Sequence, residues 1–271
     1  MHEGGKETVS GCQRSLARHV DNIGGLYREI VAGTGDMNEL SLLGGFVFSV
    51  GGEALPEISA DSQRLLAFLA LRDRVVTRNQ VSGTLWPEST DDRAGASLRS
   101  AVSRLDAPAR EAVQVTALDP ALADGVVVDF HHSQSLARRL IDRDAPPSES
   151  DIGGPAVSAL SNDLLPGWYD DWALIAAENW RQLRMHALEA VATRLTAADR
   201  LAEAGVAALA AVRAEPLRES SRAALIRVHM AEGNQSDAVG EFERYRALLR
   251  AELGLEPTSR LSRLLSGGEA P

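Results

Sequence analysis

The stretch from Leu164 to Pro257 constrains the fold more than any other part of this sequence, because its apolar residues follow the period of antiparallel helix pairs. Small residues recur where two helices must approach closely, and the Asp199-Arg200 dipeptide marks the turn between them. The positions that carry this pattern are Leu188, Val191, Ala192, Leu195, Ala204, Ala208, Ala211 and Pro216. The spacing predicts a helix pair of the kind that stacks in tetratricopeptide-like repeat proteins.

A second helix pair is expected 34 residues further along, where Ala238 takes the place of Ala204 and Gly233 marks the turn. Glycine suits that turn because it tolerates a positive φ at the end of a helix. Strict repeat identity is weaker here, since Ile226 occupies a position that favours a small residue. Such an array carries no chemistry of its own, but it offers a concave face to a partner.

A capping helix is expected ahead of both pairs, from Trp168 to Met185. A stack of helix pairs leaves one open apolar end, which a further helix must cover. Trp172, Ile175 and Leu183 are the side chains expected to cover it.

Composition limits the classes of protein that fit this sequence. The chain has 271 residues, enough for two domains with cores of their own, and no apolar run approaches the length of a membrane span. The first residues lack a signal-peptide pattern, and the single cysteine, Cys12, excludes an internal disulfide. We therefore expect a soluble protein of the reducing cytoplasm, with no membrane partner.

The net charge of -10 argues against nucleic-acid binding until its distribution is considered. Residues 40–110 hold eight basic and eight acidic residues, whereas residues 111–163 hold three basic and nine acidic residues. Because the acidity is concentrated in the middle of the chain, a local DNA-binding face within residues 40–110 remains possible.

The N-terminal half begins with a polar, glycine-containing stretch, residues 1–38, that we interpret as a flexible extension. Leu40 to Val50 is rich in strand-forming residues, Gly51-Gly52 is a turn signal, and Ala54 to Ile58 is a second extended piece. Strands are therefore expected before the first helix.

Two helices follow these strands. Asp61-Ser62 is expected to cap a helix that continues through Leu71, and Thr77 is expected to cap a second helix. The second helix should end at Trp86, because the following proline disfavours helical backbone in the residue before it.

A third helix is expected from Asp91 or Asp92 to Leu105, and its two faces differ in character. The apolar face carries Ala94, Leu98, Ala101, Val102 and Leu105. The opposite face carries Arg93, Ala96, Ser97, Arg99, Ser100, Ser103 and Arg104. Small hydroxyl residues between arginines suit a helix that enters the major groove, where arginine reaches guanine edges or phosphates. An ordinary solvated face is the alternative.

A β-hairpin is expected after the third helix. Val113 to Thr116 and Val126 to Phe130 are runs rich in β-branched residues, separated by a polar loop that contains Asp119 and Asp124. Strands, three helices and a hairpin occur in this order in a winged helix-turn-helix domain, whose third helix reads the major groove. The loop lacks Lys and Arg, so it is a poor phosphate-binding wing.

Most of the chain, residues 40–265, resembles the Streptomyces antibiotic regulatory protein family. The N-terminal half is similar to winged-helix domains of the response-regulator type through Leu42-Leu-Gly-Gly-Phe, Gly83-Thr-Leu-Trp-Pro and Ser97-Leu-Arg-Ser-Ala-Val-Ser-Arg-Leu. The C-terminal half resembles the bacterial transcriptional activator domain through Leu164-Leu-Pro-Gly-Trp-Tyr-Asp-Asp-Trp and Glu252-Leu-Gly-Leu-Glu-Pro.

This resemblance implies a mainly α fold with a small β component, in which the winged helix-turn-helix domain precedes a tetratricopeptide-like all-α activator domain. It also implies a dimer on promoter DNA, contact with RNA polymerase holoenzyme, and activation of secondary-metabolite genes. The residues it places at the DNA are Arg78, Trp86, Arg93, Ser97, Arg99, Ser100 and Arg104. Asp106 departs from the family pattern, because a basic residue commonly extends the recognition helix there.

The expected layout has five parts. Residues 1–38 form the extension, 39–130 the DNA-binding domain, 131–163 a connecting helix and irregular linker, 164–265 the activator domain, and 266–271 a disordered tail.

Other chemistry is not indicated. The sequence lacks a Gly-x4-Gly-Lys-Ser/Thr loop, and the adjacent His131 and His132 lack a nearby cysteine with which to hold a metal. Asp170-Asp171 suits a helix N-terminus better than a catalytic pair. We therefore expect no enzyme activity, cofactor or metal. A protein-interaction adaptor or ligand-sensing regulator with weak or lost DNA binding is the alternative to a DNA-binding regulator.

Overall fold

The computed structural model describes residues 37–55, 57–72, 76–115, 119–142, 144 and 148–266, which form two compact units. The N-terminal unit comprises residues 37–40 and 47–127, and the helical unit comprises residues 41–46 and 128–266. Most of the expected N-terminal extension, with Cys12, and nearly all of the expected C-terminal tail lie outside the described residues.

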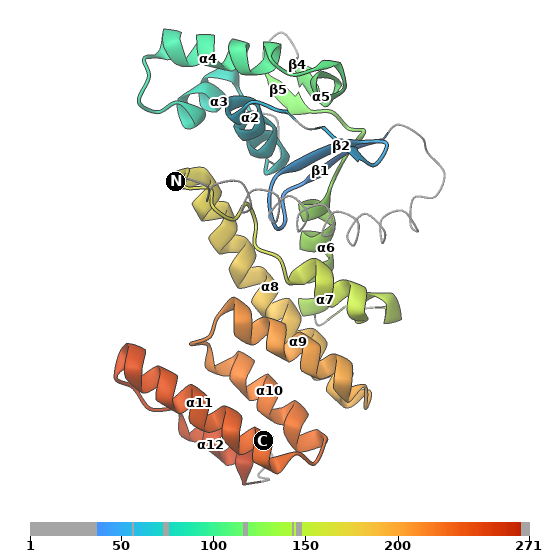
Figure 1. Ribbon diagram of the computed structural model, residues 1–271, viewed down its shortest axis with the longest axis vertical. Helices are drawn as coiled ribbons and strands as arrows, with labels where there is room; N and C mark the ends of the chain where they lie inside the picture. The colour runs from blue at the N-terminus through green and yellow to red at the C-terminus, as the bar shows by residue number, and fades with distance from the viewer. Residues whose placement is uncertain are drawn as a thin grey trace, which may run out of the picture. The chain divides into compact units, whose positions relative to one another are not determined.

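A small sheet opens the N-terminal unit (Figure 1). Its strand order is β3-β2-β1-β6. The strands are β1 (Asn38–Ser41), β2 (Val47–Val50), β3 (Glu53–Ala54) and β6 (Val126–Val128). The predicted turn at Gly51 and Gly52 is confirmed: both have positive φ, 56° and 84°, as a two-residue hairpin turn requires.

Three helices follow, α2 (Ala60–Ala70), α3 (Arg78–Leu85) and α4 (Asp91–Ser103). The predicted cap of α3 is confirmed, since Thr77 and Gln80 form a capping box. The predicted cap of α2 at Asp61-Ser62 is wrong, because Ser59 accepts from the Ser62 N–H at 3.4 Å. The Ser62 hydroxyl instead donates to the Ala101 carbonyl at 2.7 Å and links α2 to α4.

The predicted hairpin partner is also wrong. After a short helix, α5 (Ala107–Glu111), strand β4 (Val113–Val115) pairs antiparallel with β5 (Pro120–Leu122). The run that begins at Val126 forms β6, which joins the first sheet, and Asp129 already begins a helix. Proline and alanine hide β5 in the sequence, although proline is tolerated as the first residue of an edge strand.

The helical unit stacks antiparallel helices from α8 onward (Figure 1). Its helices are α6 (Asp129–Ile141), η1 (Glu149–Asp151), α7 (Gly154–Leu160), α8 (Asp171–Ala197), α9 (Leu201–Ala214), α10 (Glu219–Ala231), α11 (Gln235–Leu253) and α12 (Ser259–Leu265). Residues 131–163, which we expected to form a connecting helix and an irregular linker, contribute most of α6 and all of α7. Both helices pack against α8, because Ala137, Leu140, Val157 and Leu160 are buried.

Small residues allow the helix pairs to pack closely, as predicted. Ala204, Ala208 and Ala211 are fully buried on α9, between α8 and α10. Both predicted turns are confirmed, with φ of 59° at Asp199 and 78° at Gly233. The separate capping helix is wrong, since α8 continues through it as one helix and Ile175 is 64% exposed.

Residues 42–46 interrupt the predicted strand from Leu40 to Val50, because they pair with the helical unit. The buried Asp129 carboxylate accepts from the backbone N–H groups of Leu42 at 2.8 Å and Leu43 at 3.2 Å. The Leu165 N–H donates to the Leu42 carbonyl at 2.9 Å, and the Trp168 ring stacks on Phe46 with centroids 6.2 Å apart. The Leu-Leu-Pro-Gly-Trp motif therefore has a structural role: it holds a distant segment of the chain.

Stability of the helical unit should depend on the pH through Asp129. Burial raises the pKa of Asp129 from 3.8 to about 6, although hydrogen bonds from the Leu42 and Leu43 N–H groups act to lower it. The charged carboxylate is thus disfavoured in the folded chain. Its contribution to stability is fully present below about pH 4 and is lost as the pH rises to about 6. One pKa unit corresponds to about 1.4 kcal/mol, so this loss is on the order of 3 kcal/mol.

Urea unfolding of the wild type and of Asp129→Asn between pH 4 and 7 measures this effect. The free energy of unfolding of the wild type should fall relative to that of Asp129→Asn as the pH rises, because asparagine does not titrate. Parallel curves across this window would contradict the prediction.

Candidate nucleic-acid interface

The candidate interface is the exposed face of α4, which is held in place by its opposite face. Ala94, Leu98 and Ala101 are buried at helical spacing and pack α4 against α2 and α3. Leu105 is also buried just beyond the helix, whereas Val102 is half-buried. The stripe predicted from the sequence therefore decides which side chains α4 presents outward.

The structure brings five of the predicted DNA contacts together on α4 and its C-terminal cap. Arg93, Arg99 and Arg104 are exposed, and Ser97 and Ser100 are half-exposed between them. The Arg99 guanidinium lies along the helix near Gly95, where an added Cβ would meet Nη1 at 3.7 Å. This surface combines long cationic side chains with small hydroxyl groups, as a major-groove reader requires.

The three arginines differ in their electrostatic surroundings. Arg104, the C-cap residue, lies 3.9 Å from the Asp61 carboxylate on α2. Among the described residues, neither Arg93 nor Arg99 forms an ion pair. Phosphate contact therefore costs Arg93 and Arg99 no existing ion pair, whereas Arg104 shares its charge with Asp61.

Arg78 and Trp86 are not part of this cluster on α4. They lie at opposite ends of α3. Arg78 is the first helical residue and Trp86 is the C-cap. Eight helical residues span about 12 Å. The Nε of Arg78 is buried and lacks a hydrogen-bond partner among the described residues.

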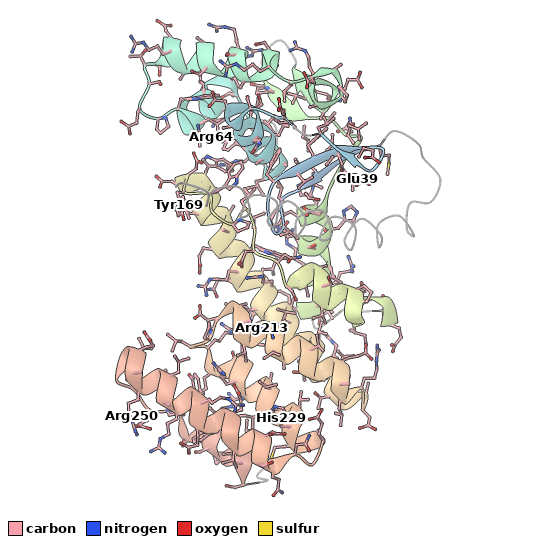
Figure 2. All side chains as sticks on the ribbon, viewed as in Figure 1. Glu39, Arg64, Tyr169, Arg213, His229 and Arg250 are labelled. Atoms are coloured by element: carbon pink, nitrogen blue, oxygen red, sulfur yellow. The ribbon has the colours of Figure 1, made fainter. Side chains whose placement is uncertain are left out.

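Two arginines that the sequence did not indicate as functional stabilise the ends of α3 and α4. Arg110 of α5 donates to the Val102 carbonyl at 2.9 Å, and Arg64 of α2, labelled in Figure 2, donates to the Leu85 carbonyl at 2.6 Å. Both satisfy carbonyl groups at the end of a helix, which lack a partner within the helix. The only sequence signal is a basic residue near a predicted helix end.

Two acidic residues begin the helix that carries the interface. Asp91 and Asp92 are exposed in the first turn of α4, where they interact favourably with the helix dipole but would repel phosphates. The prediction that Asp119 and Asp124 share one hairpin loop is wrong, because β4 pairs with β5 and not with the run that begins at Val126. Asp119 precedes β5, whereas Asp124 lies in the turn between β5 and β6.

Another candidate site considered in the sequence is the pair of adjacent histidines. His131 and His132 lie on α6, and His132 Nδ1 is 3.3 Å from the Val128 carbonyl oxygen. Within the described ranges, no three His, Cys, Asp or Glu side chains gather as metal ligands do. Of the helices that are described, none has the length and apolar character to cross a bilayer.

Comparison with known sequences identifies the second half of the chain. The family model of the bacterial transcriptional activator domain matches residues 127–266. The regulatory protein AfsR of Streptomyces griseus is 27% identical over 251 residues, and that of Streptomyces coelicolor is 29% identical over 239 residues. These alignments cover 86% and 79% of this chain but 25% and 22% of the relatives. The chain therefore spans about a quarter of the length of the curated relatives it matches.

Comparison with solved structures supports the fold. The chain is similar to Mycobacterium tuberculosis EmbR, solved in complex with a low affinity phosphopeptide, with a TM-score of 0.61 and 20% sequence identity. The match covers 87% of this chain and 67% of that chain. The predicted fold class, a winged helix-turn-helix domain followed by a tetratricopeptide-like helical domain, is confirmed.

Proposed function

Since this chain belongs to the bacterial transcriptional activator domain family, we propose that it is a transcriptional regulator that reads promoter DNA with α4 in the major groove. The resemblance to the Streptomyces antibiotic regulatory proteins is confirmed by the AfsR relatives. The observation that carries the proposal is the outward face of α4, where Arg93 and Arg99 stand exposed beside half-exposed serines.

The two units divide the work in this proposal. The N-terminal unit contacts DNA through Arg93, Ser97, Arg99, Ser100 and Arg104, with Arg78 and Trp86 near phosphates. The helical unit mediates dimerisation on DNA and contact with RNA polymerase holoenzyme, as the family resemblance implies. The regulated genes belong to secondary metabolism, and the protein acts in the cytoplasm without catalysis.

A second candidate function is a protein-interaction adaptor that has lost useful DNA affinity. The acidic residues around α4 favour this alternative, because Asp91 and Asp92 lie at the end of the helix that usually contacts base edges. The two functions predict opposite results in one experiment.

The experiment titrates the purified chain against its own upstream DNA and against unrelated DNA at two salt concentrations. The wild type should bind its own upstream DNA selectively, and its affinity should fall as salt rises. Arg99→Ala, Arg104→Ala should weaken binding by at least about thirtyfold, because each of the two lost contacts to a base or phosphate contributes about 1–3 kcal/mol.

Arg213→Ala is the matched control, since Arg213 is an exposed arginine on α9 of the helical unit (Figure 2). It should bind as the wild type does. Selective binding that survives the double substitution would rule out α4 as the reader. An absence of selective binding at low salt would favour the adaptor.

A further inference from the structure

A cavity on the helical unit is not used by the proposed DNA contact. It lies between α8, α10 and α12 and has a volume of about 280 Å³. Its apolar wall includes Ala223 and Ala224 of α10 and Leu261 and Leu264 of α12. The wall offers an apolar contact surface, while the charged side chains around it decide which ligand can bind.

Two guanidinium groups line this cavity, Arg227 from α10 and Arg260 from α12. Within the described part of the chain, neither arginine forms an ion pair or a side-chain hydrogen bond. Partial burial lowers the pKa of Arg227, the positive charge of Arg260 lowers it further, and the negative charge of Glu189 acts to raise it. The fold therefore holds two like charges close together without a counter-charge bound to either.

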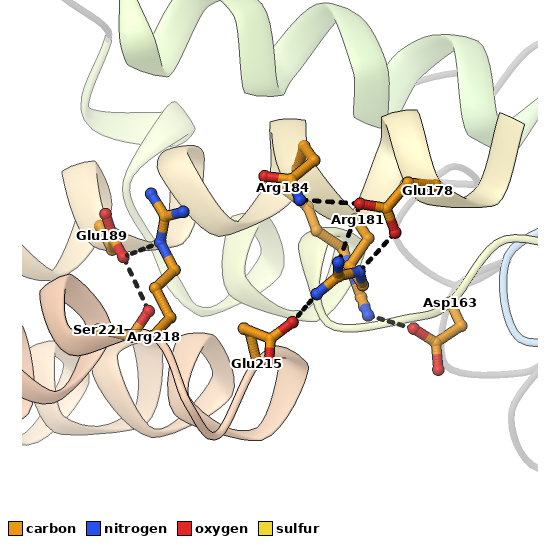
Figure 3. Close-up of polar contacts among 9 residues, drawn as sticks. Asp163, Glu178, Arg181, Arg184, Glu189, Glu215, Arg218 and Ser221 are labelled. Atoms are coloured by element: carbon orange, nitrogen blue, oxygen red, sulfur yellow. Dashed lines mark hydrogen bonds and ion pairs between the residues drawn. The ribbon is translucent and has the colours of Figure 1, made fainter. Parts of the chain in front are cut away.

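The carboxylates at the cavity form their hydrogen bonds with other groups and not with these two arginines. Glu189 accepts from Arg218 Nε at 2.8 Å and from the hydroxyls of Ser220 and Ser221 at 2.7 Å each, and Figure 3 shows Arg218 and Ser221 converging on it. Glu219 accepts from the backbone N–H of Thr258 at 2.9 Å and from its hydroxyl. Both acids are held by structural contacts, and among the described residues the guanidinium hydrogen-bond donors of the two arginines are not used.

We propose that this cavity is a binding site for a small organic anion, a carboxylate or phosphate on a compact apolar body. Arg227 and Arg260 would hold the anionic group, because guanidinium groups donate several hydrogen bonds in a geometry that matches these oxyanions. The apolar body would rest against Leu261 and Leu264. The volume is near the lower limit of small-molecule pockets, which restricts the ligand to roughly one ring or a short chain. This site is independent of the DNA contact on α4.

Isothermal titration calorimetry of the full chain with phenyl phosphate and with benzoate tests the proposal. These probes share a ring and differ in the anionic group, so they distinguish a phosphate site from a carboxylate site. At least one of them should bind at millimolar concentrations, and Arg227→Gln, Arg260→Gln should weaken that binding at least about tenfold. Thr193→Glu should also weaken it, because the new carboxylate at the cavity would neutralise the arginines.

Arg213→Gln is the control, because it removes an exposed arginine of α9 that does not line the cavity. It should bind the probe within about twofold of the wild type. Three results would overturn the proposal: neither probe binds at 10 mM, binding persists in both the double variant and Thr193→Glu, or the Arg213→Gln control loses binding equally. Circular dichroism confirms that each variant is folded, and none of these results depends on DNA affinity.

Discussion

Arg222→Ala is expected to lower the free energy of unfolding of the helical unit by about 3–5 kcal/mol, because it removes one partner of a buried ion pair. Arg222 of α10 is 8% exposed and forms an ion pair with Glu241 of α11, which is 4% exposed. Its Nε and Nη2 also donate to the Pro216 carbonyl at 3.2 and 3.1 Å. The substitution thus leaves both a buried carboxylate and the Pro216 carbonyl short of a donor.

The neighbours of Arg222 act on this cost in both directions. Its guanidinium lies 5.6 Å from the ring centroid of Tyr245, whose hydroxyl donates to the Leu217 carbonyl at 3.1 Å. Arg244 still pairs with Glu241 at 2.7 Å, which keeps the remaining carboxylate from being wholly isolated. The pair therefore joins the start of α10 to the middle of α11 at the centre of the second helix pair.

Urea unfolding followed by tryptophan fluorescence measures the effect, since Trp168, Trp172 and Trp180 lie in the helical unit. The matched control is Arg222→Met, Glu241→Leu, which replaces both charges with apolar groups of similar volume. It should be much closer to the wild type in stability than either single substitution is. A cost below about 1 kcal/mol for Arg222→Ala would indicate that the pair is effectively solvated.

Local sequence patterns predicted the helix pairs because the determinants lie within each helix. Ala204, Ala208 and Ala211 form one face of α9, and that face is buried whatever the exact partner is. Burial of side chains in the first turns of α8 was not predictable in the same way. Ile175 fits the helical period of a buried residue, yet its exposure depends on which elements pack around the start of α8.

Pairings between distant segments could not be predicted from the sequence. Leu43 forms an isolated bridge with Leu164, and Asp129 binds the backbone of residues 42 and 43. Each partner is more than 80 residues away along the chain, beyond the reach of any periodic pattern. Likewise β5 has weak strand-forming residues, and only its register against β4 makes it a strand.

The sequence predicted which residues form the candidate DNA face, but it did not predict which charged groups from other helices lie beside them. The helical period separates Arg99 from Leu98 without any knowledge of the fold. The Asp61 carboxylate beside Arg104 comes from another helix, and Arg110 reaches the end of α4 from α5. Because Asp61 shares the charge of Arg104, Arg93 and Arg99 are the stronger candidates for phosphate binding. We expect the DNA affinity to depend on this difference.

Trp180→Ala is expected to lower the free energy of unfolding by about 3–5 kcal/mol, through the cavity that it creates. Trp180 lies on α8, is 1% exposed and packs edge-on against Phe130 of α6, with centroids 5.5 Å apart. Its Nε1 donates to the Asn162 carbonyl at 2.9 Å, so alanine also leaves that carbonyl without its donor. The Trp180 side chain therefore connects α6 and the segment after α7 to α8.

Trp180→Phe separates the two contributions in the same urea experiment. Phenylalanine keeps most of the buried ring and the edge contact with Phe130 but cannot donate to Asn162, so its cost should be about 1–3 kcal/mol. Equal costs for the two variants would show that the hydrogen bond dominates, contrary to the expectation. If alanine costs clearly more, packing of residues 128–163 onto α8 contributes to the stability of the helical unit. The stable unit would then begin near residue 127, where the family match begins, and not at Leu164.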